Sequence, residues 1–149
     1  DNVVNYKGFL ADSCWSYAVG ELSEESAKLM EVTEKALYKG IEAAKVGNHV
    51  VDIGKAIQTD VEAEGFSVVR NFVGHGIGSE MHESPQIPHY NTGVRGPKLR
   101  ENMVITVEPM INVGAWQMRL DDNEWTARTI DGSTSLKRHS PARKMGQRF

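Results

Sequence analysis

The residues with the clearest chemical potential are three acids and one histidine that stand among apolar neighbours. Asp1 and Asp12 belong to strand-like segments at the start of the chain, and Glu108 interrupts the β-prone segment 103–111. His75 lies between two glycines. A carboxylate buried without a partner costs several kcal/mol, so each acid is expected to face a cation or a cage of hydrogen bonds. Carboxylates with a single imidazole suit Mn, Fe(II), Co or Zn rather than a thiolate-rich zinc site.

Hydrolysis is the chemistry that such a ligand set predicts. Carboxylates can bridge two ions, and two neighbouring ions can activate a water and polarise an amide carbonyl. Other catalytic patterns fit poorly, because Gly74-His-Gly-Ile-Gly-Ser is not a G-x-G-x-x-G loop and neither a Walker lysine nor a His-Glu-x-x-His helix occurs. Cys14 lacks the sequence signature of a nucleophile and is interpreted as a small buried strand residue.

The relation between the two aspartates depends on a β-hairpin predicted from the segments 2–6 and 9–20. With a two- or four-residue loop, facing positions add up to 15, so that Asp1 and Asp12 share one face of the hairpin. A three-residue loop would place them on opposite faces. Taken alone, the two residues favour a plainer alternative, in which Asp1 is solvated and Asp12 accepts backbone hydrogen bonds.

The segment 73–90 contains three of the five histidines of the chain, His75, His82 and His89. It also contains three glycines at alternate positions, Gly74, Gly76 and Gly78. These glycines predict a turn whose backbone angles a residue with a Cβ would resist, and they let another part of the molecule approach the chain. Such a turn would aim the His75 imidazole.

Two helices and several short strands are expected to position these residues. The spacing of apolar residues indicates helices at about 24–45, capped by Ser23, and at about 51–64. Their inward positions are predicted to be Met30, Leu37, Ile41, Ala44, Ile53, Ile57 and Val61. Strands are predicted at 66–69, 103–111 and 124–130.

Length and composition indicate one soluble, globular domain. The chain has 149 residues, of which 40% are hydrophobic and 25% charged, and no apolar stretch approaches the roughly 18 residues of a membrane span. The single cysteine excludes an internal disulfide and suits the reducing cytoplasm. The chain opens on a strand-like segment without Met, so it is expected to be a fragment of a longer protein.

Charge is distributed unevenly along the chain. The net charge is −3, but residues 137–149 carry five basic residues and no acid, which leaves −8 on the rest. The acidic charge of residues 1–136 suits a cation-binding site and argues against a nucleic-acid-binding surface. After Ser135 neither helical nor strand periodicity is evident, so residues 1–135 are predicted to form the folded domain and residues 136–149 a basic, disordered tail.

Three sequence motifs, in order, resemble those of the bacterial type I methionine aminopeptidases. They are G-H-G-I-G-x-x-x-H-E-x-P-Q, E-N-M-V-I-T-V-E-P-M and W-T-A-R-T-x-D-G-S-T-S, and they follow a pair of aspartates spaced D-x10-D. The resemblance covers residues 1 to about 135. It implies the α/β pita-bread fold, a curved antiparallel sheet with helices on its outer face. It also implies two divalent ions, Co, Mn, Fe or Zn, and removal of the initiator methionine from new polypeptides.

The resemblance also assigns roles to individual residues. His82 matches the histidine that contacts the scissile amide and assists catalysis, Trp125 resembles an aromatic residue at the rim of the methionine pocket, and Met81 stands where relatives often have a pocket Phe. From its own surroundings, Trp125 would be assigned to core packing. The implied metal ligands are Asp1, Asp12, which bridges both ions, His75 and Glu108.

The chain departs from the family pattern after Ser135. The family continues with A-Q-Y-E-H, whose glutamate bridges both metals, whereas this chain continues Leu-Lys-Arg-His and lacks that glutamate. A weakened site, holding a single ion, is therefore expected. A frameshift near codon 136 is one hypothesis for the departure, because shifting the frame at Lys144-Met-Gly-Gln can yield Lys-Asp-Gly-Pro, a turn similar to the one that follows the family glutamate. Resequencing the DNA would test it, since an intact A-Q-Y-E-H codon string must then exist in another frame.

The function predicted from these features is metal-dependent removal of N-terminal methionine, with reduced or absent activity in this shortened form. One alternative is a pita-bread module that binds a partner without catalysis, and another is a proline-directed peptidase of the same fold. The G-H-G-I-G and W-T-A-R-T contexts favour the methionine enzymes over the proline-directed ones. The implied partners are nascent polypeptide N-termini and the ribosome that carries them, with no nucleic acid and no membrane, for a monomer in the cytoplasm.

Overall fold

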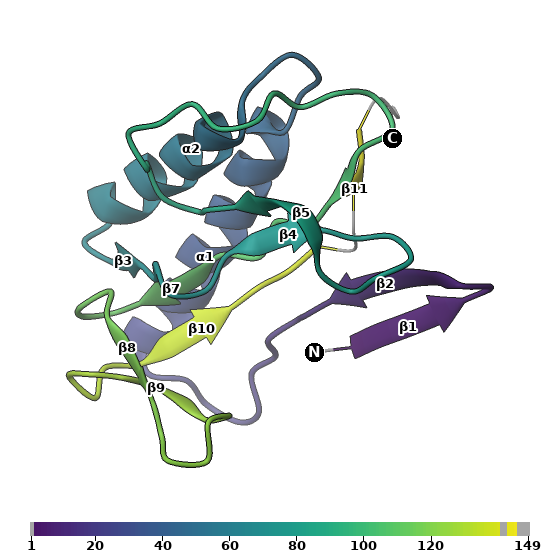
Figure 1. The fold of residues 1–149 in the computed structure, drawn as a ribbon. Helices are drawn as coiled ribbons and strands as arrows, with labels where there is room; N and C mark the ends of the chain where they lie inside the picture. The colour runs from purple at the N-terminus through teal and green to yellow at the C-terminus, as the bar shows by residue number, and fades with distance from the viewer. Residues whose placement is uncertain (1, 141–142, 146–149) are drawn as a thin grey trace.

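Two helices pack against each other and lie along one side of a set of short antiparallel strands (Figure 1). The computed structural model describes residues 2–140 and 143–145. Helix α1 spans Glu24–Ala43 and helix α2 spans Val50–Ala63. Among the described residues, no helix is long and apolar enough to cross a membrane.

The strands form small sheets in which every pairing between named strands is antiparallel. One sheet has the order β10-β7-β3, a second has the order β11-β6-β4-β5, and β8 pairs with β9. The bounds of these strands are β3 Ser67–Val68, β4 Gly74–Gly76, β5 Glu83–Ile87, β6 Val104–Ile105, β7 Met110–Asn112, β8 Met118–Leu120, β9 Ala127–Thr129, β10 Ser135–Lys137 and β11 Arg143–Lys144.

The N-terminal hairpin has the predicted register. Strand β1, Asn2–Tyr6, pairs with β2, Phe9–Ser13, so that Val3 faces Asp12 and facing positions add up to 15. The loop has two residues, Lys7 and Gly8, both with positive φ, which is the turn geometry that suits the twist of paired strands. The second strand ends at Ser13, well before the predicted position 20. Asp1 lies outside the described residues.

Both predicted helices are confirmed, with ends within two residues of the expected positions. The Ser23 hydroxyl accepts a hydrogen bond from the Ser26 N–H at 3.2 Å, which satisfies one of the unpaired donors at the start of α1. The predicted inward residues of α2 are buried, but Met30 and Ile41 of α1 are only half-buried. Leu37 and Ala44 are buried as predicted. The remaining buried residues of α1 are Leu29, Val32, Thr33, Ala36 and Gly40.

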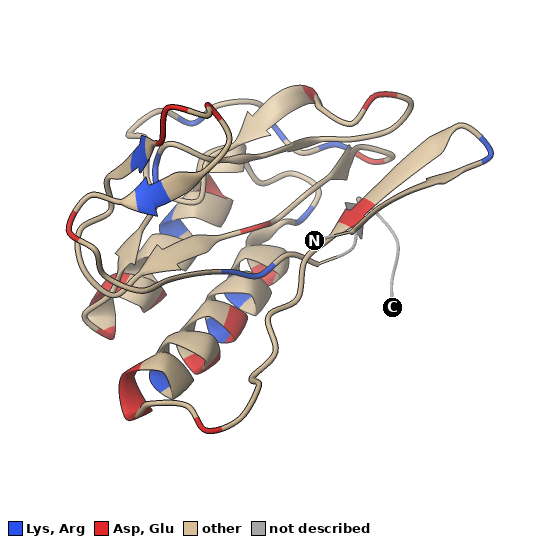
Figure 2. Cartoon of the chain, turned by 90° about the horizontal axis from the view of Figure 1, so that it is seen from below, with Lys and Arg blue, Asp and Glu red and all other residues tan. Residues whose placement is uncertain are grey.

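Charged side chains are spread over the helices, the loops and the hairpin instead of forming one patch (Figure 2). The two helices are linked on their outer side by ion pairs, with the Lys28 Nζ 3.0 Å from a Glu64 carboxylate oxygen and the Lys35 Nζ 3.5 Å from an Asp60 oxygen. Exposed pairs of this kind contribute at most about 1 kcal/mol each, so the apolar contact between the helices dominates their packing.

The prediction of a disordered tail after residue 135 is wrong for residues 136–140 and 143–145. Strand β10 crosses that boundary and pairs with β7, and β11 pairs with β6. Leu136 packs against the hydrophobic core, and Met145 is part of it. The edges of β7 and β6 supply the hydrogen-bonding partners of these strands. A strand of two or three residues is too short for alternating polar and apolar residues to reveal it in the sequence. A frameshift origin of this segment remains a prediction.

Candidate metal centre

Three of the four predicted metal ligands converge on one buried site. Asp12 comes from β2, His75 from β4, and Glu108 from the connection between β6 and β7. The His75 Nε2 lies 3.2 Å from the Glu108 Oε1 and 3.9 Å from the Asp12 Oδ2. All three side chains are buried. The structure thus brings together residues far apart in sequence, while their role as metal ligands remains a prediction and Asp1 falls outside the described residues.

The His75 ring is oriented by its own backbone. Its Nδ1 lies 2.9 Å from the Gly76 carbonyl oxygen, and its backbone N–H donates to the Thr106 Oγ1 at 2.9 Å. A carbonyl oxygen only accepts hydrogen bonds, so Nδ1 carries a proton, and Nε2 is the nitrogen that faces the two carboxylates. Histidines that bind metals commonly use this arrangement, in which the remote nitrogen donates to a carbonyl.

The glycines around His75 act through close contact, not through unusual backbone angles. Gly74 and Gly76 form strand β4, and neither they nor Gly78 has a positive φ, so the predicted turn with strained angles is wrong. A Cβ on Gly74 would lie 2.6 Å from the Thr106 carbonyl oxygen, and one on Gly76 would meet the Ser84 carbonyl oxygen. The expected approach of another part of the chain is therefore correct, because the backbone of Thr106 lies close to Gly74 and that of Ser84 in β5 lies close to Gly76.

Glu108 is held by neutral and charged partners. The Thr106 hydroxyl donates to its Oε1 at 2.7 Å, and the Lys137 Nζ lies 3.0 Å from its Oε2. Its backbone N–H donates to the His89 Nε2 at 3.1 Å, which ties the segment to a fully buried imidazole. Burial alone would raise the pKa of Glu108, but the Thr106 hydrogen bond and the Lys137 ammonium outweigh it and hold the pKa below its ordinary value. Glu108 is therefore ionised at neutral pH.

Asp12 has fewer partners than Glu108. Its side chain is 4% exposed, and its Oδ1 has no hydrogen-bond partner among the described residues. Burial and the nearby Glu108 carboxylate raise the pKa of Asp12 above its ordinary value. A buried carboxylate in this position gains free energy from any cation that can reach it.

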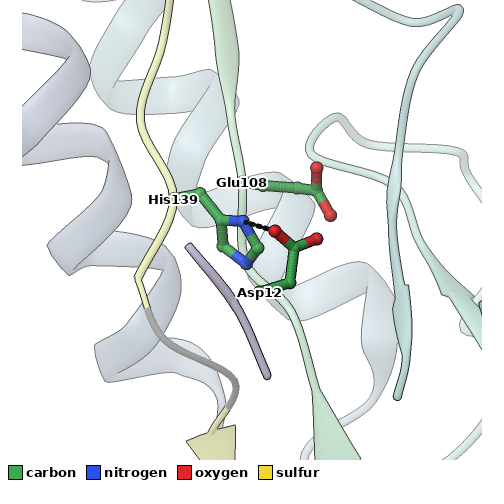
Figure 3. Close-up of side chains that lie close together, drawn as sticks. All are labelled: Asp12, Glu108 and His139. Atoms are coloured by element: carbon green, nitrogen blue, oxygen red, sulfur yellow. Dashed lines mark ion pairs between the residues drawn. The ribbon is translucent and has the colours of Figure 1, made fainter. Parts of the chain in front are cut away.

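His139 is a further member of the site that the sequence analysis missed. It is fully buried, and its backbone pairs with Cys14 in an isolated antiparallel bridge beyond the end of β2. The His139 Nδ1 lies 3.5 Å from the Asp12 Oδ1 (Figure 3). One ligand atom each from Asp12, Glu108 and His139 lies within 4.8 Å of the others. Burial lowers the pKa of His139 to about 4, so its imidazole is neutral at neutral pH and has a lone pair to offer.

Two signals in the sequence could have identified this residue. Counting the family continuation A-Q-Y-E-H from Ser135 places the family glutamate at position 139. In addition, Lys137 and His139 are two residues apart, and side chains two apart in an extended segment project to the same side. Both side chains do face the site, whereas Arg138 between them pairs with Glu34 of α1 at 3.2 Å.

A pocket of about 410 Å³ opens onto the cluster and contains the predicted substrate residues. His82 lies edge to face with His75, with ring centroids 4.5 Å apart. Met81 and Trp125 line the pocket, and Trp125 is 87% exposed, which excludes the core-packing role that its surroundings in the sequence would indicate. Other apolar lining residues are Phe72, Val73, Met110 and Ala127.

The donors present fit a divalent cation. Two buried carboxylates and two buried imidazoles form a hard-to-borderline set, as Mn, Fe(II), Co or Zn prefers. The Asp12 Oδ1 and both ring nitrogens of His139 are buried without a hydrogen-bond partner among the described residues. Unpaired buried polar atoms are rare in folded proteins, and a bound ion is one of the few ways to satisfy them together.

Comparison with known proteins places the chain in a family. The model of metallopeptidase family M24 matches residues 1–130. The chain is 50% identical over 125 residues to methionine aminopeptidase 1 of Bacillus subtilis, covering 84% of this chain and 50% of that protein. A methionine aminopeptidase structure from Rickettsia prowazekii matches with a TM-score of 0.90 and 38% identity, over 93% of this chain and 56% of that one.

A more distant structure, an X-Pro aminopeptidase from Thermotoga maritima, matches with a TM-score of 0.68 and 24% identity, over 93% of this chain and 34% of that one, which supports the shared fold alone. The chain spans about half the length of the curated relatives it matches. The predicted α/β pita-bread fold, with antiparallel strands and helices on one side, is confirmed by these structures. The family match extends over most of the sequence, and the chain belongs to metallopeptidase family M24.

Proposed function

We propose that the chain is part of a methionine aminopeptidase, which removes the N-terminal methionine from polypeptides with the help of a divalent metal ion. The observation that carries the proposal is the pocket of about 410 Å³, in which apolar side chains lie beside the buried Asp12, His75 and Glu108. An N-terminal methionine offers the matching chemistry, an unbranched apolar side chain close to the amide bond to be cleaved. Relatives with up to 52% identity carry the name methionine aminopeptidase.

The residues of this chain divide the work between binding and catalysis. Met81 and Trp125 are proposed to contact the methionine side chain, since both line the apolar part of the pocket. Asp12, His75 and Glu108 are proposed to hold the metal, which when bound supplies an activated water and polarises the amide carbonyl. His82 packs edge to face on His75, where its N–H can donate to the scissile amide and to the oxygen that gains negative charge.

The metal requirement follows from membership of a metallopeptidase family. The ion count proposed for this chain is one, because Lys137 lies against Glu108 where a second cation would otherwise be attracted. Mn, Co, Fe and Zn all suit the donors, and activity with each identifies the effective metal. The partners proposed are nascent polypeptide N-termini presented by the ribosome to a monomer, which would place the reaction in the cytoplasm.

Peptide hydrolysis tests the proposal directly. With added Co or Mn, the protein is expected to release methionine from Met-Ala-Ser, and EDTA is expected to stop the release. Peptides of the form Xaa-Pro serve as the matched control, because only a proline-directed peptidase would favour them. Preference for Xaa-Pro would replace the proposal with that alternative.

A second candidate, a non-catalytic binding module, is favoured by one observation. The ammonium of Lys137 already neutralises part of the carboxylate charge that a two-ion site would need. Binding of Met-Ala-Ser without release of methionine, at any of the four metals, would support this candidate and contradict the catalytic proposal. Fluorescence of Trp125, which lines the pocket and is exposed, provides a readout of peptide binding.

A further inference from the structure

The segment 137–139 alters the chemistry of the metal centre. We infer that His139 joins Asp12, His75 and Glu108 as a ligand of a single divalent ion, and that the Lys137 ammonium supplies the second positive charge of the site. Neither residue was singled out by sequence motifs, and the inference concerns metal binding, so it does not depend on peptidase activity.

The first argument comes from the unpaired atoms of His139 and Asp12. The His139 ring is fully buried, and neither of its nitrogens has a hydrogen-bond partner among the described residues. Its Nδ1 lies 3.5 Å from the Asp12 Oδ1, which is also buried and unpaired. This separation exceeds the 2.7–3.2 Å of an ordinary N–H···O hydrogen bond. Two buried polar atoms that face each other without bonding are satisfied together by an ion between them.

The second argument comes from the spacing of the donor atoms. Two ligand atoms that each lie about 2.1 Å from one tetrahedral ion are roughly 3.4 Å apart. The separations in the cluster are 3.2 Å for His75 and Glu108, 3.5 Å for His139 and Asp12, and 3.9 Å for His75 and Asp12. Each of these pairs is spaced to share one small ion, with the Asp12 Oδ1 facing His139 and the Asp12 Oδ2 facing His75.

The third argument comes from the orientation of His75. Its Nδ1 faces the Gly76 carbonyl, which leaves its Nε2, 3.2 Å from the Glu108 Oε1, as the ring atom that can bind an ion. A ring nitrogen and a carboxylate oxygen this close together can both bind one cation. His75 lies on β4 and His139 in the bridge to Cys14, so the two imidazoles approach the carboxylates from separate segments of the chain.

Lys137 explains why the site is inferred to hold one ion. Its Nζ lies 3.0 Å from the Glu108 Oε2, while the Oε1 of the same carboxylate faces His75. Glu108 therefore has the inferred ion on one oxygen and the ammonium on the other. A second divalent ion at this carboxylate would meet the repulsion of a fixed positive charge a few ångströms away. Removing that charge is expected to relieve the repulsion.

Titration of the metal-free protein with Co²⁺ tests the inference. Calorimetry and the visible absorption of the bound ion both measure the binding. The wild-type chain is expected to bind one equivalent. His139→Gln is expected to weaken binding by at least about 10-fold, the loss typical of disturbing a metal ligand shell. His139→Glu, which restores a ligand atom, is expected to retain tight binding. The control is His49→Asn, at a histidine whose ring contacts the Gly96 carbonyl, remote from the cluster.

Lys137→Met tests the second half of the inference, and a second equivalent of Co²⁺ is expected to bind to it. The inference would be overturned by any of three results. They are tight binding of two equivalents of Co²⁺ by the wild-type chain, unchanged affinity of His139→Gln for Co²⁺, and binding of only one equivalent by Lys137→Met. If His139→Gln does not fold, the Co²⁺-loaded wild-type protein still shows whether His139 is a ligand. Its proton NMR spectrum is expected to contain two strongly shifted imidazole N–H signals, and a single one would exclude His139. These readouts remain informative even if no peptide is hydrolysed.

Discussion

Asp12→Asn is expected to abolish tight metal binding while leaving the metal-free protein as stable as before, or more so. Asp12 is the residue that both imidazoles face, with the His139 Nδ1 at 3.5 Å and the His75 Nε2 at 3.9 Å. Asparagine has nearly the same shape but no charge, so the cation loses its central electrostatic partner. The affinity for Co²⁺ or Mn²⁺ is expected to fall by roughly 100-fold or more, the upper range for disturbed metal sites.

The opposite sign of the stability effect follows from the pKa of Asp12. Burial and the Glu108 carboxylate raise this pKa in the folded protein above its ordinary value of 3.8. A raised pKa means that the folded protein binds the proton more tightly than the unfolded chain, so the favourable contribution exists at low pH and is lost as the pH rises through the folded pKa. At neutral pH the carboxylate therefore costs stability when no metal is bound, and asparagine removes that cost.

Calorimetry gives the metal affinity, and urea denaturation in EDTA gives the free energy of unfolding of the metal-free form. Asp122→Asn is the matched control, since it makes the same chemical change on an exposed loop. The stability advantage of Asp12→Asn in EDTA is expected to shrink as the pH is lowered toward 3.8. A variant that binds metal as the wild type does, or that is clearly destabilised in EDTA at neutral pH, would show that Asp12 has a structural role instead.

Gly54→Ala is expected to destabilise the fold by about 1–3 kcal/mol, although alanine is the better helix former by about 1 kcal/mol. A Cβ on Gly54 of α2 would meet the carbonyl oxygens of Tyr90 and Pro88, the latter at 2.7 Å. These are backbone atoms of the segment that follows β5, so the helix or that segment has to move. His89 lies within this segment and accepts the Glu108 N–H, so the displacement is expected to reach the metal centre as well.

Gly40→Ala in α1 is the comparison that isolates the backbone contact. A Cβ there would lie 2.6 Å from the Ile57 Cδ1 and 2.9 Å from the Val107 Cγ1, which are ends of side chains. Side-chain ends can turn aside more cheaply than a backbone carbonyl can, so the loss of stability is expected to be smaller than for Gly54→Ala. Urea denaturation of both variants measures the difference. Equal or greater stability of Gly54→Ala relative to the wild type would mean that the helix and the segment 88–90 separate without cost.

Local sequence signals were sufficient where the structure depends on neighbours along the chain. For a two- or four-residue loop, the parity of the hairpin predicted that facing positions add up to 15, as Val3 and Asp12 do, because side chains alternate along a strand and the loop length fixes the register. The cap at Ser23 and the apolar spacing located both helices. The glycine-flanked His75 and the isolated Glu108 were identified as site residues because such residue types seldom stand among apolar neighbours without a partner.

Sequence reasoning failed where a contact partner comes from a distant segment. The glycines beside His75 were attributed to unusual backbone angles, yet Gly74 is required by the close approach of the Thr106 carbonyl, just past the end of β6. The segment after residue 135 was predicted to be disordered because three-residue strands carry too little periodicity to recognise, and their order comes from pairing with β7 and β6.

The sequence by itself determined the family, the two helices, the N-terminal hairpin and the identity of Asp12, His75 and Glu108 as candidate ligands. Each depends on residue types in a short window or on motifs in a fixed order. Only the tertiary structure decided that Lys137 reaches Glu108 and that the buried ring of His139 faces Asp12, more than a hundred residues earlier in the chain. The physical reason is that the hydrogen bonds of β10 and of the bridge to Cys14 are between segments remote in sequence, and these bonds set which side chains enter the site.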